Sequence, residues 1–247
     1  MLLLACTRGS SKNEVEQQHS IHLDYIRSQP YGTLLIEVDR VGNIQPHESI
    51  VTHVQSNLEA MLGKTVQIEL DEVLDSPEQD QSWTIAELDT LHANHFSMEV
   101  DAQTIKMHTL LVEGQFTEET DNGYRKLGHA WAQNRLVIFG QTMLTLCDSL
   151  ALDSNINRTL LCRMAIAEVW THEIGHLLGL VDSGLPMVSA HRDTDHGNHD
   201  MDPNCVMYWT TEGEVLLERL EERLQAGEAE NLWFCDACQA DIEAAKE

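Results

Sequence analysis

The chain has 247 residues, of which 42% are hydrophobic, a composition typical of a globular protein with one sizeable core. It carries 15 Lys and Arg against 41 Asp and Glu, which gives a net charge of −26. This balance excludes a nucleic-acid partner, because phosphate binding depends on clusters of basic side chains. No stretch reaches the roughly 18 apolar residues of a membrane-spanning helix, so we expect no membrane span.

The N-terminus runs through three leucines to Ala5-Cys6 and continues as a polar stretch up to Ser20. This order resembles the end of a bacterial lipoprotein signal, in which a small residue precedes the cysteine that receives lipid. We therefore expect residues 1–22 to be a leader or tether with a lipid anchor at Cys6, and an extracytoplasmic, membrane-anchored location. The apolar run is short and lacks preceding basic residues, so a cytoplasmic protein with a frayed apolar end is the alternative.

The first half of the remaining chain has the pattern of a strand, a helix and a second strand. β-branched and apolar residues between Gly32 and Gly42 indicate the first strand. Apolar residues then recur at helical spacing until Gly63, which ends the helix. The predicted elements are strands at 33–39 and 65–70, helices at 47–62 and 84–91, and an acidic loop up to residue 81.

The second half contains the longest helical pattern, followed by a long connection. Connections of this length inside a compact domain are usually functional. Cys147 and Cys162 lie in apolar, helical surroundings and are expected to be small core residues. The predicted elements are strands at 105–116 and 135–139, a helix at 157–178, a loop at 179–204, and helices at 212–225 and 236–245.

Together these elements predict an α/β fold with a mixed, twisted sheet and a smaller C-terminal subdomain. We expect a single domain over residues 23–247. Its N-terminal subdomain would span about 23–179 and end with the long helix, and its C-terminal subdomain would span 180–247.

The long helix ends in His172-Glu173-Ile174-Gly175-His176. Two histidines four residues apart lie about 40° apart around a helix axis, so both imidazoles can reach one metal ion. Glu173 projects beside that pair, where it can act as the general base toward a water molecule without being a ligand. Gly179 stands where a left-handed turn would end the helix and return the chain toward the metal. A helix with two buried histidines is the plainer alternative, but it does not explain the glutamate, the glycine and the loop together.

This segment resembles the extended motif of the metzincin zinc peptidases, in which the third ligand follows the glycine by three residues. Asp182 occupies that position here. Further along, His199 and the later Cys205-Val206-Met207 are similar to the archaemetzincin pattern, in which the third histidine precedes a Cys-x-Met sequence. An insertion separates Gly179 from His199. We favour His199 as the third ligand because imidazole suits zinc, and Asp182 is the alternative.

The same resemblance extends to Cys235-Asp-Ala-Cys238 near the C-terminus, which is similar to the closing Cys-x-x-Cys of archaemetzincins. It implies a structural zinc held by Cys205, Cys235 and Cys238. Asp200 stands where that family has its first cysteine, and this aspartate or a nearby histidine would complete a tetrahedron. A disulfide between two of the thiols, or no metal at all, is the alternative, and an envelope location would favour oxidation.

The resemblance further implies that Met207 lies in a Met-turn, a tight turn that forms an apolar floor beneath the histidines. It implies a zinc-dependent endopeptidase or aminopeptidase acting on peptide or protein substrates, with Glu173 as general base. The alternative is a non-catalytic, zinc-binding module of the cell envelope that interacts with peptides. Glu173 speaks against that alternative, because a binding module needs no base.

Overall fold

The computed structural model describes residues 20–77, 81–118, 123–153 and 156–247. Its centre is a five-stranded sheet in the order β2-β1-β4-β7-β6. The first four of these strands run parallel, and β6 pairs antiparallel with β7 at one edge. The strands are β1 (Thr33–Val41), β2 (Thr65–Leu74), β4 (Thr104–Val112), β6 (Gly128–Trp131) and β7 (Arg135–Phe139).

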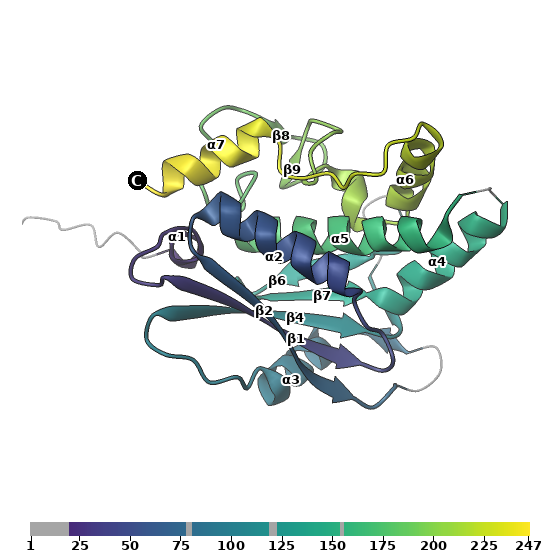
Figure 1. Cartoon of the computed structure of the whole chain (residues 1–247), viewed down its shortest axis with the longest axis horizontal. Coiled ribbons are helices and arrows are strands. Elements are labelled where there is room, and N and C mark those ends of the chain that lie inside the picture. The colour runs from purple at the N-terminus through teal and green to yellow at the C-terminus, as the bar shows by residue number, and fades with distance from the viewer. Residues whose placement is uncertain (1–19, 78–80, 119–122, 154–155) are drawn as a thin grey trace, which may run out of the picture.

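Helices cover both faces of this sheet (Figure 1). On one face lie α2 (Glu48–Leu62), α4 (Gly140–Asp153) and α5 (Arg158–Leu177), and on the other lies α3 (Ile85–His95). The larger apolar core fills the space between the sheet and the first group. A smaller cluster around Leu88 and Phe139 lies beneath α3. The remaining elements of this half are α1 (Ile21–Ile26) and the paired strands β3 (Ser82–Trp83) and β5 (Gln115–Phe116).

Local sequence explains how the central elements begin and end. Strand β1 is buried along nearly its whole length, as expected for a central strand of a sheet covered on both faces, and this burial includes Glu37 and Asp39. Helix α2 ends at Gly63, whose left-handed backbone (φ 67°) is the conformation that glycine adopts without steric cost. Helix α5 begins after Asn157, whose side chain accepts a hydrogen bond from the backbone N–H of Leu160.

The C-terminal part of the chain lies over α5, on the side away from the sheet (Figure 1). It consists of β8 (Arg192–Asp193), β9 (His199–Asp200), the short 3-10 helix η1 (Trp209–Glu212), α6 (Val215–Gln225) and α7 (Asp236–Ala245). Helix α5 is therefore covered on both sides, and almost every residue from Leu161 to Leu177 is buried. Polar side chains at such positions require partners or a function.

The structure confirms the α/β architecture, with a mixed sheet and the long helix α5 beneath a smaller C-terminal part. Cys147 and Cys162 are buried within α4 and α5, as expected. Some boundaries were wrong. Strand β2 continues to Leu74 into the expected acidic loop, and α1 begins at Ile21 inside the expected leader. Strand β6 was not predicted.

The lipid-anchor prediction at Cys6 lies outside the described residues. Within the described ranges, none of the helices combines the length and the apolar character that crossing a bilayer requires.

Candidate functional site

Three histidine rings converge between α5 and the C-terminal part. His172 and His176 come from α5, and their Nε2 atoms lie 3.1 Å apart. The ring of His199, from β9, has its centroid 5.2 Å from the centroids of both other rings. One nitrogen atom from each ring lies within 4.8 Å of the other two. The structure thus brings together the two helical histidines and the favoured third histidine.

In His172 and His199, the ring nitrogen that faces away from the cluster is held by a backbone carbonyl oxygen. Nδ1 of His172 lies 2.7 Å from the carbonyl oxygen of Val206, and Nδ1 of His199 contacts the carbonyl oxygen of His196. A carbonyl oxygen can only accept, so each Nδ1 donates and each Nε2 keeps its lone pair for another partner. Nε2 of His199 is buried and has no hydrogen-bond partner among the described residues.

This donor set fits a zinc ion. Burial lowers the pKa of His172 to about 3, and burial also holds the pKa of His176 well below its usual value. Both rings are therefore neutral at physiological pH, the form in which imidazole binds a metal. Three imidazoles that leave a fourth position open are a known ligand set of catalytic zinc.

Asp182, the alternative third ligand, lies elsewhere. The chain leaves α5 through Gly179 (φ 84°) in a tight turn, and Asp182 itself has a left-handed backbone (φ 63°). Its side chain is about half exposed and pairs with Arg192 at 2.5 Å. Asp182 therefore has a cationic partner in the inserted loop and does not join the three histidines.

Glu173 is buried beside the three histidines, with 1% of its surface exposed, and its Oε1 has no hydrogen-bond partner within the described ranges. Burial raises its pKa well above the ordinary value, and the charge of Glu212 adds to this effect. Glu212 is held nearby because its carbonyl oxygen accepts a hydrogen bond from the N–H of Leu127 at 2.7 Å. Glu173 is thus a buried carboxyl group with a raised proton affinity, and the backbone at Ala130 holds it by a hydrogen bond.

The free edge of β6 lies next to this carboxyl group. A Cβ atom at Gly128 would lie 2.6 Å from Oε1 of Glu173, so the glycine leaves the space in which the carboxyl group stands. A cavity of about 180 Å³ opens beside His176 and is lined by Ala130, Trp131 and His22. His176 is therefore accessible from the β6 side.

Met207 forms the packing contact expected beneath the histidines. It is fully buried, and a Cβ atom at Gly175 would lie 2.3 Å from its Sδ. The N–H of Tyr208 donates to the carbonyl oxygen of Cys205 at 3.1 Å, which closes a tight turn around Met207. The carbonyl of Val206 in the same turn accepts the hydrogen bond from His172. The turn therefore supports the helix at the point where the first histidine leaves it.

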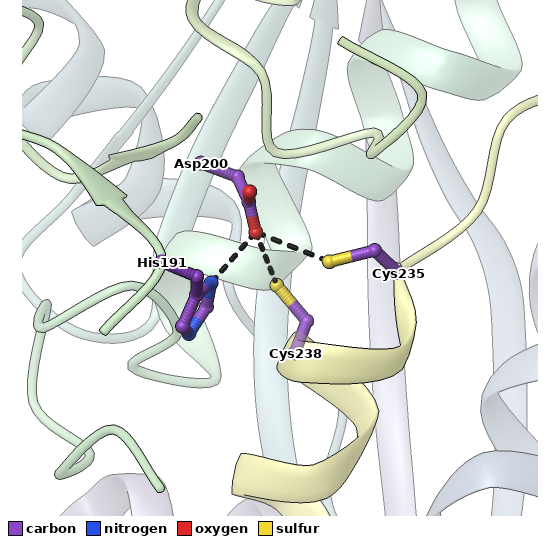
Figure 2. Close-up of side chains that lie close together, drawn as sticks. All are labelled: His191, Asp200, Cys235 and Cys238. Atoms are coloured by element: carbon purple, nitrogen blue, oxygen red, sulfur yellow. Dashed lines mark hydrogen bonds and ion pairs between the residues drawn. The ribbon is translucent and has the colours of Figure 1, made fainter. Parts of the chain in front are cut away.

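A second cluster of metal-ligand side chains lies on the other side of β9 (Figure 2). It contains His191, Asp200, Cys235 and Cys238. Oδ2 of Asp200 lies 2.7 Å from Nδ1 of His191, 3.1 Å from Sγ of Cys235 and 3.4 Å from Sγ of Cys238. Three of the four predicted structural-zinc residues thus come together, accompanied by a histidine.

The fourth predicted residue, Cys205, lies at the edge of this cluster. Its Sγ is 3.7 Å from Sγ of Cys238 and accepts a hydrogen bond from the N–H of Cys235. The five cysteines in the described part of the chain are free thiols. The sequence interpretation left room for a nearby histidine in this cluster but did not name His191, and it did not include the partner Asp241. The spacing of Asp241, three residues after Cys238 on the same helix, was the available signal.

No protein-family model matches the chain, and no curated protein matches it. Solved structures do match the chain. Archaemetzincin from Methanopyrus kandleri is 19% identical with a TM-score of 0.53, and the match covers 88% of this chain and 97% of that one. The chain has the archaemetzincin fold. A zinc-dependent peptidase from Methanocorpusculum labreanum is 15% identical with a TM-score of 0.51, and the match covers 84% of this chain and 99% of that one. The archaemetzincin fold accounts for the order of sheet, active-site helix and C-terminal part described above.

Proposed function

We propose that this chain is a zinc-dependent peptidase in which His172, His176 and His199 bind the metal and Glu173 is the general base. The observation that carries the proposal is the convergence of three imidazoles, one fully buried and one with an unpartnered Nε2, beside a buried carboxyl group whose Oε1 has no hydrogen-bond partner within the described ranges. The two solved structures described above support it, since one is an archaemetzincin and the other a zinc-dependent peptidase.

The chemistry follows from the positions of these side chains. A zinc ion held by three imidazoles would polarise the scissile carbonyl and acidify a water molecule. Glu173 accepts a proton from the attacking water as the new C–O bond forms. It then gives that proton to the amine nitrogen as the C–N bond breaks, so no group on the protein becomes covalently modified. Burial raises the proton affinity of Glu173, which suits a group that both takes and returns a proton.

The test compares the wild-type protein with Glu173→Gln on a broad peptide library analysed by mass spectrometry. We expect the variant to keep its zinc and to lose about 10²- to 10⁴-fold in kcat. Glu99→Gln removes an exposed carboxylate outside this site and is the matched control. Equal behaviour of wild type and Glu173→Gln would instead indicate a peptide-binding module without catalysis.

Zinc content separates the two candidates for the third ligand. We expect His199→Ala to lose the catalytic zinc and Asp182→Ala to retain it, because Asp182 is paired with Arg192 away from the cluster. The reverse result would assign the ligand to Asp182. Parallel assays on free and N-acetylated peptides distinguish an aminopeptidase, which requires a free amino terminus, from an endopeptidase.

A further inference from the structure

We propose that His22 is a specificity-determining residue of the peptidase site, and that the cavity beside His176 is a subsite for an uncharged substrate side chain that donates a hydrogen bond. Asparagine, glutamine, serine and threonine belong to this class. The inference rests on the proposed function, because it names the kind of residue that the peptidase would accept next to the scissile bond.

The ring of His22 lies at the end of α5, although it precedes that helix end by 155 residues in the chain. It is 7% exposed, and its Nδ1 lies 2.8 Å from the carbonyl oxygen of Leu177, the residue after His176. A carbonyl oxygen can only accept, so Nδ1 donates and Nε2 keeps its lone pair. His22 also lines the cavity that opens beside His176. The ring therefore offers the cavity a hydrogen-bond acceptor.

Two glycines leave the space in which this ring lies. A Cβ atom at Gly184 would lie 2.3 Å from Nε2 of His22, and a Cβ atom at Gly179 would lie 2.9 Å from its Cγ. The turn between the glycines is closed by the N–H of Leu185, which donates to the carbonyl oxygen of Gly179 at 2.8 Å. Within this turn Val181 has a left-handed backbone (φ 52°), which is uncommon for a β-branched residue. Such strain persists only where the surrounding structure imposes it, so the turn is shaped around the imidazole ring.

Helix α1 fixes His22 from its other side. Nζ of Lys64 donates to the carbonyl oxygens of Asp24 and Arg27, at 2.8 Å and 2.7 Å. These carbonyl groups lie at the end of α1, where a helix leaves them without partners of its own. Tyr25 of the same helix is fully buried. The acceptor is therefore held in position before a substrate arrives, which reduces the entropic cost of binding.

The cavity is small and uncharged. Its volume is about 180 Å³, and since a cavity of about 150 Å³ is enough for benzene, it has room for one side chain of moderate size. As far as the structure describes its lining, this contains no Asp, Glu, Lys or Arg, and its polar side chains besides His176 include His22, Gln133 and Ser183. An ammonium group would lack a counter-ion there and would lie next to the zinc ion, and a carboxylate would face the lone pair of His22. Both are therefore disfavoured against an uncharged donor.

The tip of the β6–β7 hairpin forms another wall of the cavity. Ala132 and Gln133 connect the two strands with φ values of 53° and 67°, a turn in which glycine is usually found. Residues held in such strained conformations are concentrated at ligand-binding sites. Trp131 on the same wall donates its indole N–H to Asp89 at 2.8 Å, so it presents its ring to the cavity. The hairpin therefore contributes the amide of Gln133 and an apolar surface.

Cleavage of a peptide library that varies the residues on both sides of the scissile bond tests the subsite. We expect the wild type to prefer asparagine, glutamine, serine or threonine at one of these positions over charged residues. His22→Phe keeps a ring in the same space but removes the acceptor. It should lower kcat/KM about 3- to 10-fold for the asparagine peptide, mainly through KM, and leave the matched alanine peptide unchanged.

His22→Gln is the conservative variant, because its amide can donate to Leu177 and still accept from a substrate. It should restore part of the preference for the asparagine peptide. His47→Phe replaces an exposed histidine of another region and is the matched control. A purely structural role of His22 would instead lower cleavage of the asparagine and alanine peptides by the same factor, which would overturn the inference.

Failure of the inference and failure of the proposed function give different results. Cleavage by the wild type with the same asparagine-to-alanine ratio in His22→Phe would overturn the subsite and leave the peptidase intact. Absence of cleavage by the wild type would contradict the peptidase. Calorimetry on the zinc-loaded Glu173→Gln protein then decides the subsite, with peptides that carry asparagine, alanine or lysine at each position in turn. Asparagine should bind most tightly at one position, and equal affinities before and after adding His22→Phe would overturn the inference.

Discussion

Gly128 of β6 and Glu173 of α5 face one another so closely that a Cβ atom on the glycine would lie 2.6 Å from Oε1 of the glutamate. The same atom would lie 2.6 Å from Cγ1 of Val169. Packed atoms do not approach to this distance, so any side chain at residue 128 would push α5 or the carboxyl group aside. The edge strand therefore sets the position of Glu173, the proposed general base.

We expect Gly128→Ala to lower kcat/KM about 10- to 100-fold, because catalytic groups lose efficiency when they are displaced by as little as 1 Å. Zinc content should not change, since the substitution does not contact the three histidines. Gly32→Ala is the control, because a Cβ atom at residue 32 has no neighbour within 4 Å. Wild-type kinetics in Gly128→Ala would show that Glu173 is not the group that this strand positions.

Gly175 and Met207 make a second close approach, between α5 and the Met-turn. An added Cβ atom would meet Sδ of Met207 at 2.3 Å and Cε1 of Phe234 at 2.8 Å. We expect Gly175→Ala to lower the free energy of unfolding by about 1–3 kcal/mol through overpacking. The cost should be smaller in a Met207→Ala background, where space becomes available. A denaturant double-mutant cycle measures this coupling, and strictly additive effects would contradict it.

The buried pair of Glu168 and Arg223 should stabilise the contact between α5 and α6. Glu168 is fully buried, and its Oε1 accepts from Arg223 and from the N–H of Leu232, both at 2.8 Å. We expect Arg223→Ala to lower the free energy of unfolding by about 2–4 kcal/mol, because it leaves a buried carboxylate without its cation. Arg125→Ala breaks a solvent-exposed pair with Glu214 and should cost less than about 1 kcal/mol. Equal costs in urea unfolding would contradict this difference.

A buried chain of polar groups on the α3 side of the sheet should make stability depend on pH. Nε2 of His108 lies 3.0 Å from Asp39, and its Nδ1 lies 2.7 Å from Nδ1 of His92. Burial, followed by the nearby charge of His108, lowers the pKa of His92 from its ordinary value of 6.5 to about 4.

The unfolded chain therefore protonates His92 at a higher pH than the folded chain does. The free energy of unfolding should fall as the pH decreases from about 6.5 to about 4, by at most about 3 kcal/mol from this residue. Urea unfolding across this range should show a shallower pH dependence in His92→Gln. His47→Gln removes an exposed histidine and should keep the wild-type slope. Identical slopes in all three proteins would exclude His92 as the source.

The sequence predicted the elements whose local pattern is strong. The strand at 135–139 and the helix at 236–245 appear with the expected bounds, because both are continuous in pattern and end at clear breaks. Strand β6 was missed because Gly-His-Ala-Trp has no β-branched residue. Its pairing with β7, rather than its own preference, makes it a strand.

Among the site residues, those whose arrangement follows from local sequence were predicted, and most of those that depend on tertiary contacts were not. His172, Glu173 and His176 lie on one helix, so their spacing alone places them side by side. His199 was named from its downstream context. His191 and Asp241 could not be assigned in advance, because their contact joins residues 50 positions apart through a loop with no regular pattern. The role of Gly128 could not be predicted from the sequence for a similar reason, since it depends on a contact with a helix more than 40 residues away.

The two consecutive residues of β9 belong to different clusters, because successive side chains of a strand point to opposite faces. His199 faces the three histidines, and Asp200 faces the thiols. Inserting one residue between His199 and Asp200 would turn Asp200 to the opposite face and away from the thiols. A change of length should therefore disturb the two clusters less between Gly179 and His191, where the loop carries no such register, than next to the His199–Asp200 pair.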